Sequence, residues 1–154
     1  MVGADNVNVG RHVVQFYGRD EELAERVNGY CRSVTARTFA FSREAPAAAR
    51  HFAVATLNAW GAGDMAGDLA GDVALVVTEL AANAIVHARS AFTVILSVHD
   101  DLLRISVRDA GPPDGAGLRA TPLHGLAVVD AMASRWGVES LGNAGKTVWV
   151  DLLR

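Results

Sequence analysis

The sequence contains a single cysteine, Cys31, and no recognisable export signal. One thiol cannot close a disulfide within the chain, and the opening MVGADNVNVG has neither the basic nor the apolar region of a signal peptide. We therefore expect a cytoplasmic protein.

The chain also lacks a basic excess and a long apolar run. Its 14 Lys and Arg residues are outnumbered by 17 Asp and Glu residues, which gives a formal net charge of −3. This removes the electrostatic basis of non-specific nucleic-acid binding, so we expect no direct contact with nucleic acid. The unbroken aliphatic runs, such as the one at 73–77, fall far below the roughly 18 residues of a membrane-spanning helix. We therefore expect no membrane contact.

Two common kinds of catalytic site are missing as well. The 5 histidines show no metal-ligand spacing with Cys31 or with a carboxylate. No Gly-x-Ser-x-Gly elbow of a hydrolase is present. The sequence therefore predicts neither zinc chemistry nor a serine-hydrolase triad.

What the chain does have is enough apolar content for one folded domain. Hydrophobic residues make up 51% of its 154 residues and charged residues 20%, proportions typical of a globular protein. The pattern predicts an α/β fold, a two-layer sandwich with a mixed, mostly antiparallel sheet covered by helices on one face. The elements expected are strands at 12–17, 38–41, 91–98, 102–107, 138–141 and 147–152, helices at 20–30, 46–60, 72–88 and 125–135, a loop at 61–71, and a loose arm over the first ten residues.

A narrow polar stripe interrupts the apolar surface of the helix expected at 72–88. Glu79, Asn83 and His87 recur every four residues, and each such step rotates about 40° around an α-helix. A carboxylate in an enclosed cleft can act as a general base, and an amide oxygen one turn later can ligate Mg²⁺. Taken alone, the same spacing is more often that of a solvated helix face.

Three further segments combine glycine with a polar side chain. Asp109-Ala110-Gly111 follows an expected strand, where the carboxylate can accept a hydrogen bond from an exocyclic amine, although an ordinary Asp-Gly turn has the same pattern. His124-Gly125-Leu126 opens a helix whose free N–H groups suit a phosphate or a simple cap. In Gly145-Lys146-Thr147, the threonine can hydrogen-bond a base, and we interpret the lysine as a solvated charge at the strand edge.

Taken in order, these segments resemble the nucleotide-binding boxes of the GHKL (histidine-kinase-like) ATPase superfamily. VTELAANAIVHA at 77–88 is similar to the asparagine box of one branch, the serine-protein kinase anti-sigma factors of Gram-positive bacteria. RDAGP at 108–112 and HGLAVVD at 124–130 resemble the first and second glycine boxes, and GKTVWV at 145–150 resembles the usual last strand. The resemblance covers about residues 38–152.

The resemblance implies a Bergerat-type ATPase fold, ATP and Mg²⁺ as cofactors, and a division of roles along the helix at 72–88. Asn83 would be the Mg²⁺ ligand, and His87 would belong to the same cofactor-binding box. Glu79 would be the general base that takes the proton from a serine or threonine hydroxyl as the oxygen attacks the γ-phosphorus.

By the same resemblance, the other boxes would hold the nucleotide. Asp109 would bind the adenine amino group, Thr147 would make a second adenine contact, and Gly111 would let the lid pass the nucleotide. Phosphate would meet backbone N–H groups at the start of the following helix, at His124, Gly125 and Leu126.

Two functions fit these boxes. The resemblance implies an ATP-dependent serine/threonine protein kinase that phosphorylates an anti-sigma antagonist, and the presence of both Glu79 and Asn83 favours it because a pure binder needs no base. Pro112 and Pro113 stiffen the start of the short lid at 112–123. This departure favours the alternative, a non-catalytic nucleotide-binding module that sequesters a sigma factor or an antagonist.

We expect residues 1–36 to be an arm with a strand-helix extension, followed by the ATPase domain at 37–154. HVVQFY at 12–17 with DEEL at 20–23 resembles the opening of a sensory domain described in methanogens and methylotrophs. A spare strand at a sheet edge can pair with a second copy of the chain. We therefore expect a homodimer.

Overall fold

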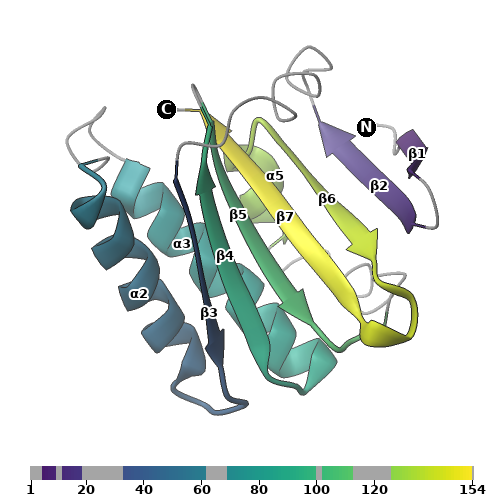
Figure 1. The fold of residues 1–154 in the computed structure, drawn as a ribbon, viewed down its shortest axis with the longest axis horizontal. Helices are drawn as coiled ribbons and strands as arrows, with labels where there is room; N and C mark the ends of the chain where they lie inside the picture. Colours follow the sequence, from purple (N-terminus) through teal and green to yellow (C-terminus); the bar gives the residue numbers. More distant parts are fainter. Residues whose placement is uncertain are drawn as a thin grey trace.

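The computed structural model describes residues 5–9, 12–18, 33–61, 69–99, 102–112 and 126–153, the first two ranges as backbone alone. In these ranges a seven-stranded sheet is covered by helices on one face (Figure 1). The strand order is β1-β2-β6-β7-β5-β4-β3. The strands are β1 (Asp5–Val9), β2 (His12–Gly18), β3 (Ser33–Phe39), β4 (Phe92–Val98), β5 (Leu102–Asp109), β6 (Arg135–Ser140) and β7 (Lys146–Leu153).

Each neighbouring pair of these strands is antiparallel. The pairs β1 with β2, β4 with β5, and β6 with β7 are consecutive in the chain, and short connections of this kind make antiparallel neighbours. The predicted two-layer α/β sandwich is confirmed. Within the described strands, the sheet is wholly antiparallel, where the sequence had suggested a mixed one.

The helices α2 (Ala45–Ala59), α3 (Leu69–Asn83) and α5 (Leu126–Met132) lie together on the inner face of the sheet. Pro46 lies in the first turn of α2, where its missing N–H removes no helical hydrogen bond. A π-helical turn, η2 (Ala84–Ala88), continues α3, and a 3₁₀ turn, η3 (Gly142–Ala144), connects β6 to β7. The helices and the inner face of the sheet share one hydrophobic core.

Alternate residues of a strand point to opposite faces, so each strand has an inner and an outer set of side chains. On β7 the core residues are Val148, Val150 and Leu152. The alternate residues Thr147, Trp149 and Asp151 therefore belong to the outer face.

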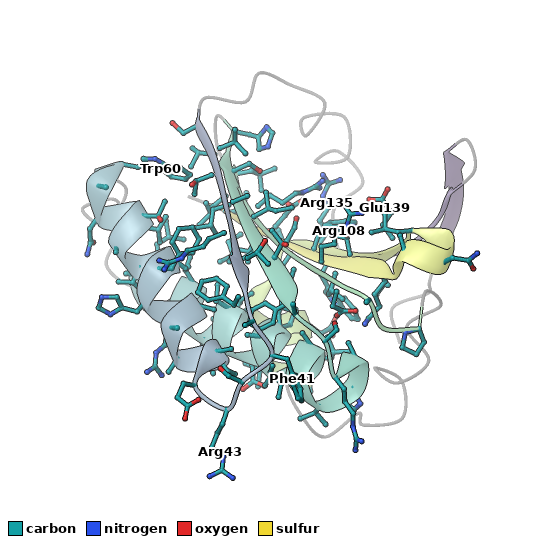
Figure 2. All side chains as sticks on the ribbon, turned by 60° about the horizontal axis from the view of Figure 1, so that its bottom comes forward. Phe41, Arg43, Trp60, Arg108, Arg135 and Glu139 are labelled. Atoms are coloured by element: carbon teal, nitrogen blue, oxygen red, sulfur yellow. The ribbon has the colours of Figure 1, made fainter. Side chains whose placement is uncertain are left out.

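A buried ion cluster lies on the outer face of β5, β6 and β7. Asp151 is fully buried and accepts hydrogen bonds from Arg104 Nε and Arg135 Nε, each at 2.7 Å. The two guanidinium carbons lie 4.4 Å and 5.6 Å from the centroid of a Trp149 ring. Figure 2 shows Arg135 on the same side of the sheet as Arg108. The cluster ties three strands together on the face opposite the helices.

The structure corrects several predicted boundaries in the first half of the chain. The first ten residues were expected to be a loose arm, but residues 5–9 form β1 because β2 offers them an antiparallel partner. The strand expected at 38–41 is β3, which ends at Phe39. The helix expected at 72 begins at Leu69, whose side chain already packs into the core. The helix expected at 20–30 lies outside the described residues.

Near the C-terminus, the helix expected to reach Arg135 ends at Met132. Arg135 instead begins β6, where it pairs with Asp151 of β7. Local helical periodicity did not predict this boundary, because Arg135 pairs with a strand that comes later in the chain.

The stretch Leu69–Ala88 forms 20 helical residues that are long and apolar enough to cross a membrane by length and composition. The prediction of no membrane span rested on unbroken aliphatic runs, which are shorter than this helix. In the structure, α3 buries Val73, Val76, Val77 and Leu80 in the core shared with the sheet. In this structure α3 is therefore a core helix, whose apolar side chains pack against the sheet.

Candidate functional site

Asn83 is the last residue of α3, and its side chain lies in the interior. The residue is 9% exposed, and the amide nitrogen Nδ2 has no hydrogen-bond partner among the described residues. A buried donor without an acceptor costs roughly 1–3 kcal/mol, so folded proteins seldom keep one. The unpartnered amide is therefore available to donate a hydrogen bond to an acceptor atom at the end of α3.

Glu79 lies one helical turn before Asn83 and is half-buried. The sequence spacing predicted one stripe through Glu79, Asn83 and His87, but α-helical geometry holds only for the first two. His87 lies in η2, and a π-helical turn takes more residues than an α-helical turn. The step from Asn83 to His87 therefore falls short of a full turn, and His87 departs from the line. Short π-helical turns inside helices are frequent at functional sites.

Asp109 ends β5, and Lys146 at the start of β7 holds its carboxylate. The two residues are directly opposite each other in the antiparallel pair. Lys146 Nζ donates to Oδ1 at 2.7 Å and to Oδ2 at 2.9 Å, and the Gly111 N–H donates to Oδ1 at 2.8 Å. The lysine and aspartate side chains are 2% and 3% exposed. The carboxylate predicted to bind adenine is thus enclosed in an ion pair within the chain.

Gly111 makes room for the lysine. A Cβ atom at this position would lie 2.8 Å from Lys146 Nζ, 2.9 Å from Asp109 Oδ1 and 2.9 Å from Ala88 Cβ. The ammonium group therefore lies between the end of β5 and the end of η2. The resemblance had implied that Gly111 lets the lid pass the nucleotide; in the structure, Lys146 lies against the space left by the missing side chain.

Gly145 brings the start of β7 against the end of β5. Its φ of +112° is rare for any residue with a side chain, and a Cβ would lie 2.0 Å from the Asp109 carbonyl oxygen. Gly145 belongs to a predicted segment but was given no role there; it fixes the point from which Lys146 reaches Asp109.

Thr147 is not brought together with Asp109. In the register of β5 and β7, Thr147 is opposite Arg108, and Asp109 is opposite Lys146. Because side chains alternate along a strand, Thr147 points to the outer face while Lys146 points to the inner face with Asp109. The structure therefore puts Lys146 at the inner position where the sequence had expected the threonine contact.

Lys146 is the one lysine in the 154 residues, and it is 1% exposed. The interpretation of Lys146 as a solvated edge charge is wrong. A correct pairing of β5 with β7 would have placed Lys146 opposite Asp109, but β6 and α5 separate these strands in the chain. No local pattern reveals such a register.

A scan of protein families matches residues 39–152 to the histidine kinase-like ATPase domain. The chain belongs to this family. A search of curated proteins finds no match. The matched range of the ATPase domain includes α3, η2, β5 and all but the last residue of β7. The residues described above therefore lie inside it, and membership supports ATP binding.

The remaining predicted contacts of the ATPase domain fall at the start of α5. His124 and Gly125 lie outside the described residues. Leu126 is the first residue of α5, and its half-buried side chain packs against the core. Because the Leu126 side chain packs against the core, only the backbone N–H of Leu126 could contact a phosphate.

Among the described residues, Asn83, which is predicted to hold the phosphate end of Mg²⁺·ATP, has an unpartnered polar group, whereas the carboxylate predicted to hold the base is already paired. Asn83 offers an amide oxygen for the metal and an unpartnered N–H for a phosphate oxygen. The described residues contain no group of three or more His, Cys, Asp and Glu side chains suited to a metal ion. Magnesium sites that rely on substrate phosphates need only one or two protein ligands. At the base end, a carboxylate offers about four acceptor positions, and Lys146 and Gly111 occupy most of those on Asp109.

Proposed function

We propose that the protein is an ATP-binding anti-sigma regulatory protein that phosphorylates a serine or threonine of an anti-sigma antagonist. The observation that carries the proposal is the pair formed by half-buried Glu79 and buried Asn83 on successive turns of α3. Membership of the ATPase family makes ATP the expected ligand, and the sequence resemblance puts it beside this helix. The anti-sigma role rests on the sequence resemblance.

Each side chain of the pair has a distinct role in this proposal. Asn83 would hold Mg²⁺ through Oδ1 and hydrogen-bond a phosphate oxygen through Nδ2. Bound Mg²⁺ supplies neutralisation of the phosphate charge. Glu79 would accept the proton of the attacking hydroxyl, and no described residue forms an ion pair or hydrogen bond with its carboxylate, which leaves the carboxylate available for that proton.

The test separates nucleotide binding from phosphoryl transfer. We would titrate wild-type protein and Glu79→Gln with ATP and Mg²⁺ in a calorimeter, and incubate both with γ-labelled ATP and a soluble extract of the source cells. We expect the two proteins to bind ATP with equal affinity. Labelled phosphoserine or phosphothreonine, above that of the extract without added protein, should form only when the wild-type protein is added. Equal labelling by the variant would contradict the role of Glu79.

A second candidate is a non-catalytic nucleotide-binding module that sequesters a sigma factor or an antagonist. Pro112 and Pro113 favour it, because two prolines stiffen the start of the predicted lid, whose closure phosphoryl transfer would need. Saturable binding of ATP without any labelled protein in the same experiment would select this candidate.

A further inference from the structure

We propose that Lys146 determines the nucleotide affinity and base specificity of the site, because its ammonium group competes with the 6-amino group of adenine for Asp109. The inference rests on the proposed binding of ATP. It concerns a residue for which the sequence had suggested no contact with Asp109. In the absence of nucleotide, the Lys146 ammonium group occupies the position on Asp109 that the adenine amino group would take.

The position of the ammonium group supports this competition. Nζ contacts both oxygens of Asp109, and a Cβ added at Gly111 would meet both Nζ and Ala88 Cβ. These three residues come from the end of β5 and the end of the α3–η2 helix. The predicted base site uses the end of β5 as well, through Asp109. A purine that placed its amino group on Asp109 would therefore meet the lysine side chain.

The chemistry of the two donors explains why they exclude each other. An ammonium group and an exocyclic amine are both hydrogen-bond donors, and each seeks an acceptor oxygen. The ammonium group also carries a charge, which makes its hydrogen bonds to a carboxylate the stronger ones. With both partners almost fully buried, leaving either one unpaired is costly. ATP must therefore give Lys146 a new partner or forgo the contact with Asp109.

The flexible lysine side chain makes such an exchange feasible. Its ammonium group ends a four-carbon stem and can reach a different acceptor. Water outside the site offers acceptors of that kind, and there the ammonium group is accessible to a reagent. Displacement by ATP, rather than permanent blockage, is therefore the form of competition that we infer.

The first arm of the test compares Lys146→Met, which keeps much of the side-chain volume but no charge, with wild-type protein. Each would be titrated with Mg²⁺·ATP and with the triphosphate of purine riboside, which lacks the 6-amino group. We expect the variant to bind ATP at least about tenfold more tightly, the value of one hydrogen bond to a charged group. The analogue should gain much less, so the preference for ATP increases.

Two controls accompany this arm. The double variant Asp109→Asn with Lys146→Met removes both charges together, and its preference for ATP over the analogue should fall again. Cooperative urea unfolding of each variant would show that it is folded. If Lys146→Met does not fold, the second arm decides, because it uses the native chain.

The second arm exploits the presence of one lysine in the sequence. An acetylating reagent for amines would be added to wild-type protein, and modification of Lys146 would be followed by mass spectrometry with the N-terminal amine as internal reference. We expect slow acetylation without nucleotide and faster acetylation with Mg²⁺·ATP, because ATP displaces the ammonium group. The purine riboside triphosphate should leave the rate low.

Each outcome decides between the inference and the proposed function. Unchanged or weaker ATP binding by folded Lys146→Met, or slow acetylation at saturating ATP, would overturn the competition and leave ATP binding intact. Absence of ATP binding by both proteins would overturn the proposed function, and the inference with it.

Discussion

Asp109 and Thr147 lie on adjacent strands but point to opposite faces of the sheet. The register of β5 with β7 pairs Asp109 with Lys146 and leaves Thr147 opposite the exposed Arg108. A shift of one residue along β7 would exchange the two faces. Lys146, the residue before Thr147, is therefore the β7 side chain that contacts the carboxylate of Asp109.

This arrangement predicts that Thr147→Val leaves nucleotide affinity unchanged. The hydroxyl points away from Asp109, and a half-buried outer side chain of similar shape should change the free energy of unfolding by about 0.5 kcal/mol or less. Calorimetric titration with Mg²⁺·ATP would measure the affinity. A loss as large as that caused by Asp109→Asn would show that Thr147 contacts the nucleotide after all.

Asn83→Ala should separate binding from stability. The variant loses the amide that would hold Mg²⁺ and phosphate, so we expect nucleotide affinity to fall by at least about tenfold. It also removes a buried donor without a partner, so the free energy of unfolding should change by about 1 kcal/mol or less. Titration and urea unfolding would be measured on the same preparation. A strongly destabilised variant would mean that Asn83 serves the core instead.

Gly145→Ala should destabilise the protein more than Gly142→Ala, its matched control in the same turn. Both glycines have positive φ values, +112° and +61°, and the added side chain costs about 1 kcal/mol or more in such a conformation. At Gly142 the Cβ would meet nothing within 4 Å, whereas at Gly145 it would lie 2.0 Å from a backbone oxygen. Urea unfolding would compare them. Equal losses would show that no close approach exists at Gly145.

Asp151→Asn should lower the free energy of unfolding by about 3–5 kcal/mol. The variant leaves Arg135, which is 3% exposed, without its carboxylate inside the protein. Arg104→Gln is the control, because the Arg104 side chain is 25% exposed and Asp151 keeps Arg135 when it is removed. The control should cost about 1 kcal/mol or less. Similar small losses in both variants would indicate that water reaches the cluster.

Local patterns in the sequence were sufficient for most of the fold. Alternating runs predicted β4, β5 and β7 to within about two residues, and the apolar periodicity of α3 predicted the helix that carries Glu79 and Asn83. These elements are specified by neighbours in the chain, so a short window contains the information. The start of β6 escaped prediction because the ion pair of Arg135 with Asp151 is made with a different strand.

The candidate site was predictable in its residue types but not in its contacts. Asp109 was singled out from its position at a strand end, and that position is confirmed. Its partner Lys146 depends on which strands pair and in which register, and this is set by the whole sheet. The departure of His87 from the polar stripe likewise follows from the π-helical turn, which four-residue spacing does not reveal.

The pairing of β2 with β6 has a consequence for the order of assembly. Val14 lies opposite Glu139, so one partner is synthesised near the beginning of the chain and the other near its end. During translation the hairpin of β1 and β2 leaves the ribosome long before its place in the sheet exists, and contacts between distant residues slow folding. The hairpin must therefore wait for the β6–β7 hairpin, and until then the edge of β2 that pairs with β6 in the finished sheet has no partner strand.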